Sequence, residues 1–495
     1  MSDNALSVLF ATAECAPWVK TGGLGDVSAA LPAALRRLGI DARVLMPGYP
    51  EVLAAARPRR RSKARTVTAL PACGATRLVE AVLPNGVPLI VVDHPSLYDR
   101  PGGPYQNDAG EDWPDNPWRF GLLSKVAAML AAPEAPLAWR PQVIHCNDWQ
   151  TGLAPAYMHF SAPSPARCGS VMTIHNLAFQ GCFAPDWVAR LDLPPESYGT
   201  DGVEFHGTLS FLKAGLYYAD AITTVSPTYA REIQTEALGF GLDGLLSWRR
   251  DALTGILNGV DTDEWNPAAD PMLARPYDAA TLKAKATNKR ELQRRFGLAL
   301  LPDVPLLGVV SRFTQQKGLD LLADIAPQVI ALPAQLAVLG LGDADLEHAF
   351  QRLAGFHPHR IATRIGFDNE LAHLVEAGAD LFVMPSRFEP CGMNQMYSQR
   401  YGTPPIVRAT GGLLDSVVDC NPVTLAAGAA TGFVFTEPEA GALLAAIARA
   451  IDAYHDPRSW RALQRNGMAK AFGWDAAAKR YAGIYATVVR QISPA

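Results

Sequence analysis

Residues Lys20 to Val27 (KTGGLGDV) constrain the fold most, because they separate an apolar run from a helical pattern. Leu6 to Ala11 is a short apolar run of the kind buried in parallel sheets, and Val27 to Leu38 has helical spacing that ends at Gly39. The segment therefore predicts a strand, a loop and a helix. Its glycines allow positive φ and close approach to a ligand, and the helix start favours an anion such as phosphate. A glycine-rich turn that binds nothing is equally consistent with these residues alone.

The same strand-loop-helix pattern returns in the second half of the chain. Apolar runs lead into loops rich in glycine and charge in three places: 306–311 into 311–318, 336–339 into 340–343, and 380–384 into 385–392. Alternating strands and helices favour parallel sheets covered by helices, and 495 residues exceed what one hydrophobic core usually serves. We therefore predict an α/β protein of two doubly wound domains that face each other across a cleft, the first ending near residue 253.

Composition limits the classes of partner. Hydrophobic residues at 49% and a net charge of -4 argue against a dedicated nucleic-acid or membrane-surface binder. The N-terminus has no basic segment before its short apolar run, and seven cysteines without a C-x-x-C pair are typical of reduced thiols without structural zinc, so we expect a cytoplasmic protein. A basic run from Arg57 to Arg65 is left without a function.

Two further strands of the first half end in polar residues. Apolar runs lead into His145–Trp149 (HCNDW) and Thr173–Asn176 (TIHN), and the carboxyl ends of strands are where open α/β sheets bind ligands. Tyr98 to Trp118, rich in Pro, Gly and Asp, predicts a long loop that borders a site. Arg77 to Asp93, with its Asn85-Gly86 turn, predicts a hairpin.

Six segments together resemble bacterial glycogen synthases and their plant starch synthase relatives. They are Lys20–Asp26 (KTGGLGD), Thr173–Gly181 (TIHNLAFQG), Phe211–Gly215 (FLKAG), Leu257–Asp261 (LNGVD), Ser311–Phe313 with Lys317-Gly318, and Arg387–Gly392 (RFEPCG). One such motif would be weak evidence, but six in the family's order are not expected by chance.

The resemblance implies a glycosyltransferase-B fold with an acceptor-side domain (1–253), a nucleotide-sugar domain (254–472) and a C-terminal helix (473–495) that packs back on the first domain. It implies an enzyme of glycogen biosynthesis, a retaining hexosyltransferase. Such an enzyme transfers glucose from ADP-glucose, or alternatively UDP-glucose, to the non-reducing end of an α-1,4-glucan, either glycogen or a malto-oligosaccharide.

The resemblance also implies roles for residues of the second half. Arg312 and Lys317 match the cations at the donor diphosphate, where negative charge builds as the bond to the sugar breaks. Glu389 matches a carboxylate beside the donor glucose, with the backbone amides of Cys391 and Gly392 at the phosphate. The position eight residues beyond this acid holds a tyrosine, so front-face attack, with the donor phosphate accepting the proton, is preferred to a covalent intermediate.

In the first half, His175 matches the catalytic histidine of the family and Asp148 matches a residue on the acceptor side. Donor contacts are implied for Lys20, Gly23, Asp26, Asn258, Gly342 and Phe367. Asp26 can cap the helix, bind the donor glucose, or do both. Phe367 stands where an aromatic ring can stack on the base, often tyrosine in the family, and a position in the hydrophobic core is an equal alternative.

Neither a metal ion nor a cofactor is expected. Asp261-Thr262-Asp263 and Asp343-Ala344-Asp345 have metal-binding spacing, but the second pair stands where a helix begins, so acids at a helix start are the better interpretation. A phosphorylase that uses pyridoxal phosphate would need a late lysine, and 318–469 contains none. The first loop also lacks the G-x-G-x-x-G pattern of a dinucleotide-dependent oxidoreductase. A glucan-binding homologue without activity is the last alternative.

Overall fold

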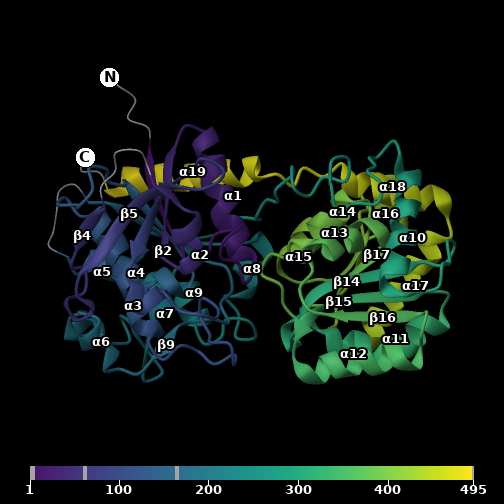
Figure 1. The fold of residues 1–495 in the computed structure, drawn as a ribbon, viewed down its shortest axis with the longest axis horizontal. Helices are drawn as coiled ribbons and strands as arrows, with labels where there is room; N and C mark the ends of the chain where they lie inside the picture. The colour runs from purple at the N-terminus through teal and green to yellow at the C-terminus, as the bar shows by residue number, and fades with distance from the viewer. Residues whose placement is uncertain (1–5, 59–63, 162–166, 493–495) are drawn as a thin grey trace. The chain divides into compact units, whose positions relative to one another are not determined.

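The computed structural model describes residues 6–58, 64–161 and 167–492, and the chain divides into two compact units. The first unit takes in Met1–Gly259 and Trp474–Ala495, and the second takes in Val260–Gly473 (Figure 1). The first boundary lies after Gly259 rather than after residue 253, because Leu253–Gly255 forms β13, an edge strand of the first sheet.

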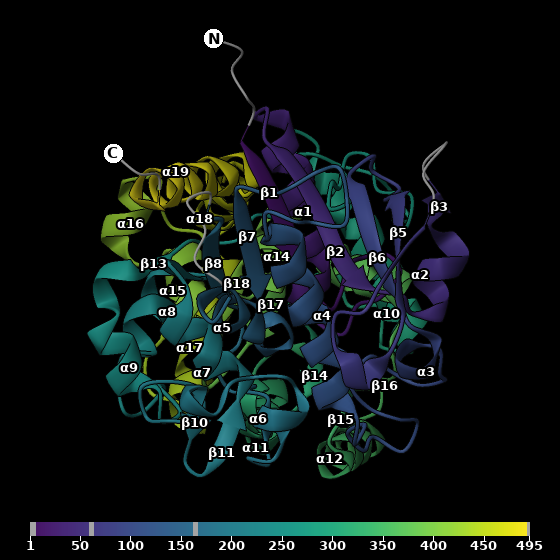
Figure 2. The ribbon, with the colours of Figure 1, turned by 90° about the vertical axis from the view of Figure 1, so that its left-hand side faces the viewer.

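The first unit is built on one large sheet with strand order β13-β12-β8-β7-β1-β2-β6-β5-β3, and β4 also pairs with β5. From β13 to β6 every pairing is parallel, and β5 runs antiparallel to β6 (Figure 2). The strands are β1 (Ser7–Ala11), β2 (Asp41–Pro47), β3 (Arg57–Pro58), β4 (Arg65–Val67), β5 (Thr76–Val82), β6 (Pro88–Asp93), β7 (Val143–Asn147), β8 (Gly169–Ile174), β12 (Ala221–Thr224) and β13. The predicted hairpin is therefore confirmed as β5 and β6. The basic run begins in β3 and ends in β4, and its central residues 59–63 lie outside the described residues.

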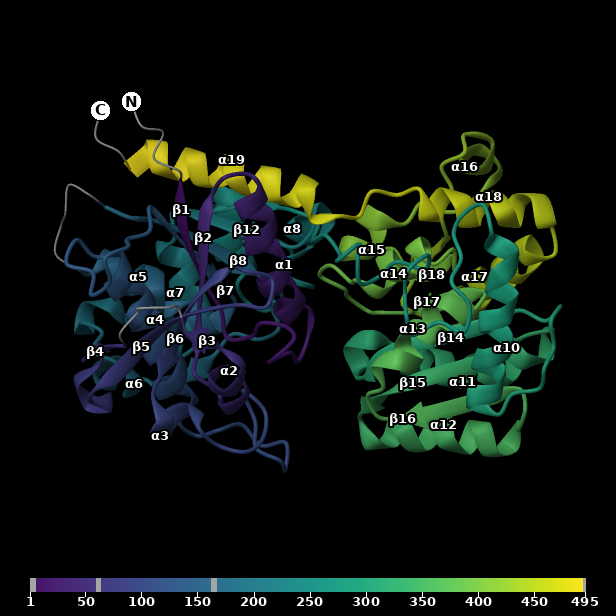
Figure 3. The same cartoon turned by 45° about the horizontal axis from the view of Figure 1, so that its top comes forward.

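Helices cover both faces of this sheet, and a small sheet of β9 (Cys182–Phe183), β10 (Glu204–Phe205) and β11 (Thr208–Ser210) stands beside them. The helices are α1 (Gly23–Arg37), α2 (Pro50–Ala55), α3 (Pro95–Tyr98), α4 (Asn116–Ala131), α5 (Leu153–His159), α6 (Trp187–Arg190), α7 (Phe211–Tyr218), α8 (Pro227–Glu232), α9 (Asp243–Trp248) and α19 (Trp474–Ile492). The C-terminal helix α19 packs on α1 and β8 of this unit (Figure 3). The loop predicted over Tyr98–Trp118 is shorter than expected, since α4 begins at Asn116.

The second unit has a fully parallel sheet with strand order β16-β15-β14-β17-β18-β19. The strands are β14 (Leu306–Phe313), β15 (Gln335–Gly342), β16 (Ile361–Ile365), β17 (Leu381–Met384), β18 (Pro405–Arg408) and β19 (Phe433–Phe435). The helices are α10 (Lys285–Phe296), α11 (Leu319–Ala331), α12 (Ala344–Phe356), α13 (Asn369–Gly378), α14 (Asn394–Arg400), α15 (Gly411–Ser416), α16 (Pro422–Ala426), α17 (Ala440–Tyr454) and α18 (Pro457–Met468). Each face of the sheet has its own hydrophobic core, one beneath α11 and α17 and one beneath α10 and α13.

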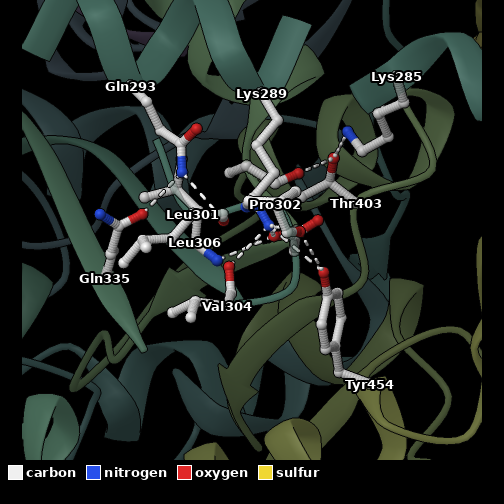
Figure 4. A network of polar contacts seen from close by, with 12 residues as sticks. Lys285, Lys289, Gln293, Leu301, Pro302, Val304, Leu306, Gln335, Thr403 and Tyr454 are labelled. Atoms are coloured by element: carbon white, nitrogen blue, oxygen red, sulfur yellow. Dashed lines mark hydrogen bonds and ion pairs between the residues drawn. The ribbon is translucent and has the colours of Figure 1, made fainter. Parts of the chain in front are cut away.

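Buried lysines attach α10 to this sheet (Figure 4). The Nζ atom of Lys289 lies 2.7 Å from the carboxylate of Asp380 and donates to the carbonyl oxygens of Pro302 and Val304. One turn earlier, Lys285 donates to the hydroxyl of Thr403 at 2.6 Å, and burial lowers the pKa of Lys285 to about 7. Buried ammonium groups need such complete sets of partners, so these contacts fix α10 against the strand ends.

Both sheets follow the doubly wound strand order 3-2-1-4-5-6, counted along their parallel strands, with β13 added to the first sheet. The order reverses between β1 and β7 in the first unit, and between β14 and β17 in the second. Sheets of this kind bind ligands where the order reverses, beyond the carboxyl ends of the strands. Among the described residues, no helix is long and apolar enough to cross a membrane.

Candidate active site

The point where the order of the second sheet reverses brings Lys317 and Glu389 together. Lys317 follows β14 and Glu389 follows β17, and the lysine Nζ lies 2.6 Å from the glutamate Oε2. The Ser386 hydroxyl donates to the same oxygen at 3.0 Å, and Glu389 is only 5% exposed. Gly318 lets the two loops meet, because its φ is +63° and a Cβ would overlap the carbonyl oxygen of Pro385. The structure therefore joins two residues that the sequence had assigned separately.

Two glycines of α15 contact the carbonyl oxygen of Glu389. The Gly412 amide donates to the carbonyl oxygen of Glu389 at 3.1 Å, and a Cβ on Gly411 would overlap that same oxygen. Gly392 adopts a φ of +68° in the turn after Cys391. Because α14 begins only at Asn394, Glu389 lies in the loop before this helix and not at its start.

The cations around this point differ in their partners. Arg387 is already neutralised, since its guanidinium contacts both carboxylate oxygens of Asp320 at 2.7 and 2.5 Å. Arg312 lies on β14, one position beyond the predicted strand end, and is exposed. Among the described residues, no hydrogen bond or ion pair is recorded for its guanidinium. Arg312 can therefore offer its full charge to an anion.

Exposed apolar side chains cluster at the carboxyl ends of β15 and β16. Phe367 is 80% exposed, and Leu341 and Ile365 on the paired strands are also exposed. A position of Phe367 in the hydrophobic core, the alternative left open by the sequence, is therefore wrong. Gly342, at the end of β15, has a φ of +154° and packs against the backbone of Phe313, where a Cβ would overlap.

The two Asp-x-Asp segments are used locally. The Asp343 side chain caps α12 by accepting the Asp345 amide at 3.0 Å, which confirms the interpretation as acids at a helix start. Asp261 accepts the amides of Asp263 and Glu264 and so closes a turn. The first aspartate of each segment therefore accepts hydrogen bonds from backbone amides of the residues that follow it.

In the first unit, Asp148 and His175 lie in contact at the ends of the neighbouring strands β7 and β8. The Asp148 Oδ1 accepts the His175 amide at 2.7 Å, and the His175 Nε2 lies 3.0 Å from the Asn147 Oδ1. Burial raises the pKa of Asp148 to about 7, against the backbone hydrogen bond from His175, which lowers it. Burial also lowers the pKa of the His175 ring to about 3, so this imidazole is neutral at ordinary pH. These residues form a rigid polar pair, as expected for groups that orient a substrate.

The Lys20 loop differs from its prediction. The helix α1 already begins at Gly23, and Gly22, Gly23 and Gly25 are absent from the residues with positive φ. Gly25 is closely packed, because a Cβ would approach the Lys20 side chain to 3.1 Å and the Val19 carbonyl oxygen to 3.2 Å. The Lys20 Nζ pairs with the Asp26 carboxylate at 2.8 Å. The N-cap residue of α1 is Gly22, and Asp26 lies within the first turn, so the expectation that Asp26 caps the helix is wrong.

Sequence analysis missed Glu14, which holds this loop in place. Glu14 is 3% exposed and accepts the Thr21 amide at 2.7 Å, the Thr21 hydroxyl at 2.6 Å and the Tyr105 hydroxyl at 2.5 Å. An acid between a buried strand, which ends at Ala11, and a glycine loop was the available signal. Asn258, predicted to contact the donor, is 6% exposed, and its Oδ1 has no hydrogen-bond partner among the described residues.

Comparison with known proteins places this geometry in a family. Residues 7–248 match the family model of the starch synthase catalytic domain, and residues 292–467 match that of glycosyl transferases group 1. The chain is 58% identical to a glycogen synthase of Aromatoleum aromaticum, over 97% of this chain and 96% of that protein. The chain belongs to the starch and glycogen synthase family. A glycogen synthase of Nitrosomonas eutropha is 56% identical over 99% of this chain and 98% of its own length.

Solved structures agree with this assignment. The catalytic domain of starch synthase IV from Arabidopsis thaliana, bound to ADP and acarbose, has a TM-score of 0.85 and 29% identity. The match covers 98% of the present chain and 100% of the starch synthase chain. A sucrose-phosphate synthase of Thermosynechococcus elongatus, 19% identical with a TM-score of 0.59, shares the fold. The chain is therefore a glycosyltransferase with the predicted α/β glycosyltransferase-B fold of two Rossmann-like sheets.

Proposed function

We propose that this chain is a glycogen synthase that transfers glucose from ADP-glucose to the non-reducing end of an α-1,4-glucan, with retention at the anomeric carbon. The observation that carries the proposal is the contact between Lys317 and the buried Glu389 where the order of the second sheet reverses. In the proposed reaction the lysine faces the leaving diphosphate and the carboxylate faces the donor sugar. Relatives named glycogen synthase, and a starch synthase solved with ADP and acarbose, support these substrates.

The second unit offers a candidate binding site for the base of the donor nucleotide. The exposed Phe367, with Leu341 and Ile365 beside it, offers an apolar surface on which a purine can stack. Phenylalanine lacks the hydroxyl of tyrosine, so stacking is its contribution. We propose adenine as the base, and UDP-glucose is the competing donor that the experiment below tests.

Charge on the leaving group is the central requirement of the reaction. As the bond from the anomeric carbon to the diphosphate breaks, Arg312 and Lys317 stabilise the negative charge, with the amides of Cys391 and Gly392 nearby. Glu389 stabilises the positive charge that develops on the sugar ring. The acceptor hydroxyl attacks from the face that the diphosphate leaves, and a phosphate oxygen accepts its proton, so no covalent enzyme intermediate is needed.

The first unit is proposed to hold the acceptor. His175 and Asp148 orient the reacting sugars, since they are fixed to each other through the backbone amide. Lys20, Gly23, Asp26, Asn258 and Gly342 complete the proposed donor contacts. Because two cations serve the diphosphate, we propose that the reaction requires neither a metal ion nor a bound cofactor.

The proposed partners are glycogen or malto-oligosaccharides, without nucleic acid or membrane. A net charge of -4 supports this choice, since polyanions bind basic surfaces. All seven cysteines are free thiols, which supports the proposed cytoplasmic location.

Nucleotide release with each donor tests the function. We expect ADP release from ADP-glucose that depends on added glycogen, slower release from UDP-glucose, and rates that a chelator does not change. Faster turnover of UDP-glucose would overturn the donor assignment. If glycogen causes no nucleotide release from either donor, the proposed function is wrong, and a glucan-binding homologue without activity is the remaining alternative.

A further inference from the structure

Tyr397 stands on α14, eight residues beyond Glu389, and its ring stacks flat on the ring of Trp265. The two centroids lie 3.8 Å apart, and the ring planes differ by 7°. Trp265 also stacks on His373 of α13, at 3.9 Å and 12°. Because both rings lie within 4 Å of one centroid, Trp265 is held between them, and it is 8% exposed. The proposed reaction uses neither Trp265 nor Tyr397.

Further contacts attach the C-terminal half of α14 to the segment around Trp265. The Arg400 guanidinium donates to the carbonyl oxygens of Trp265 and Thr262, at 2.8 and 3.0 Å. The hydroxyl of Tyr401, which is fully buried, donates to the Asp270 Oδ2 at 2.6 Å. The first residues of the second unit therefore hold this end of α14 through a ring stack and three hydrogen bonds.

The opposite end of α14 holds the turn to which the donor phosphate is assigned. Gln395 is fully buried, and its Nε2 donates to the carbonyl oxygens of Cys391 and Gly392, both at 3.0 Å. In a trans peptide the C=O and N–H groups point in opposite directions. The contacts of Gln395 therefore direct the amides of Gly392 and Met393 away from its side chain. Gly392 has a left-handed φ of +68°, and successive amides in such a turn form an anion-binding concavity.

Gln395 also joins this turn to the loop of Glu389. Its Nε2 lies 3.0 Å from the Ser416 hydroxyl, which donates to the carbonyl oxygen of Gly412 at 2.6 Å. The Gly412 amide in turn donates to the carbonyl oxygen of Glu389. A displacement of Gln395 therefore disturbs both the amides of the turn and the backbone that carries the carboxylate.

We propose that Trp265 is a positioning residue for the donor diphosphate and that it acts through α14. This helix has seven residues, about two turns, so it moves as one body. The stack of Trp265 on Tyr397 sets the place of the helix, and Gln395 passes that place on to the phosphate turn. The inference rests on the proposed function, and it adds a residue outside the site on which binding of the diphosphate depends.

Calorimetric binding of ADP tests this role without any turnover. Trp265→Leu removes the ring between Tyr397 and His373, whereas Trp265→Phe keeps a smaller one. We expect the Kd for ADP to rise about tenfold in Trp265→Leu, the value of one hydrogen bond to a charged group, and about threefold in Trp265→Phe. The kcat of Trp265→Leu should fall by about 10², as when a reacting group is misplaced by about 1 Å, with the KM for glycogen unchanged.

Trp460→Leu is the matched control in the same unit. Trp460 is 7% exposed and packs edge-on against Tyr454, with centroids 5.2 Å apart, in the hydrophobic core beneath α11 and α17. Its replacement leaves a cavity, as the replacement of Trp265 does, so both leucine variants should have lower melting temperatures. Only the Trp265 variants should bind ADP more weakly.

The outcomes separate the inference from the proposed function. An unchanged Kd for ADP in both Trp265 variants, or an equal rise in Trp460→Leu, would overturn the positioning role and leave the proposed function intact. If the unmodified chain does not bind ADP, the proposed function is wrong and the inference falls with it. Where Trp265→Leu does not fold, the Kd of Trp265→Phe decides, because this variant keeps an aromatic ring between Tyr397 and His373.

Discussion

The Nζ atom of Lys317 lies 2.6 Å from the Oε2 atom of Glu389, although 72 positions separate the two residues. Replacing Lys317 with methionine removes a cation from the proposed leaving-group site and leaves the buried carboxylate of Glu389 without a cationic partner. We expect kcat to fall by about 10² to 10³, as when a single donor is removed from a charge-stabilising site. The unpaired carboxylate should also lower the free energy of unfolding by about 3 to 5 kcal/mol. Steady-state kinetics and denaturant unfolding measure the two effects.

A double variant separates these two effects. Adding Glu389→Gln to Lys317→Met removes the buried charge, so stability should return toward that of the unmodified chain while activity stays low. Recovery of activity together with stability would show that the pair is structural and that neither residue serves the reaction.

Phe367 offers a prediction with a control on the same unit. Phe367→Ala should raise the KM for the nucleotide sugar, because stacking on a base is worth about 1 to 3 kcal/mol. Since Phe367 is 80% exposed, its removal should leave the melting temperature unchanged. Phe356, 76% exposed at the end of α12, is the matched control, and Phe356→Ala should change neither quantity. Equal KM values for the two variants would show that Phe367 does not bind the nucleotide sugar.

The order of strands, loops and helices could be predicted because it depends on local patterns. The apolar runs at 306–311 and 380–384 correspond to β14 and β17, and the loops beyond them hold Lys317 and Glu389. The roles of individual glycines were harder to predict, because a glycine can be required either by a positive φ or by a close contact that leaves no room for a Cβ. Gly318 needs both, whereas Gly25 needs only the contact.

Contacts between distant residues account for what the sequence did not show. The contact between Glu14 and Tyr105 joins residues 91 positions apart, and local patterns do not show which distant loops will meet. The pairing of Arg387 with Asp320 likewise distinguishes it from Arg312, although both arginines stand in motifs of the family. Partner choice of this kind depends on tertiary packing.

Asp148 gives a prediction about pH. Burial raises the pKa of Asp148 to about 7 in the folded chain, against about 3.9 for an unperturbed carboxyl. Between these values the folded state holds a proton that the unfolded state has lost, so this group makes stability fall as the pH rises from about 4 to 7. Asp148→Asn removes the titration and keeps an oxygen for the His175 amide. The free energy of unfolding of the variant, measured against the unmodified chain, should therefore rise across this range.

A flat difference between the two proteins over this range would show that Asp148 is ionised at its ordinary pKa. Asp186→Asn, which changes an exposed aspartate of the same unit, is the matched control for the removal of one carboxyl group.

A buried polar chain links the C-terminal helix to the strands that carry Asp148 and His175. The Tyr485 hydroxyl on α19 lies 2.7 Å from the His145 Nδ1, and the His145 Nε2 lies 2.5 Å from the Thr173 hydroxyl. Burial lowers the pKa of His145 to about 3, so the ring is neutral and needs a partner on each nitrogen. Tyr485→Phe leaves the Nδ1 atom buried without one. We expect the free energy of unfolding to fall by about 1 to 3 kcal/mol.

Kinetics decide whether this chain of contacts also positions the site. His145 and Asn147 both lie on β7, and Thr173 lies on β8, which ends directly before His175. A shift of either strand therefore moves the proposed acceptor residues. At temperatures where the variant is still folded, we therefore expect Tyr485→Phe to have a lower kcat than the unmodified chain, with the KM for the donor unchanged. Thr487→Val, at an exposed position of the same helix, should alter neither stability nor kcat. A loss of stability with kcat unchanged would limit Tyr485 to the attachment of α19.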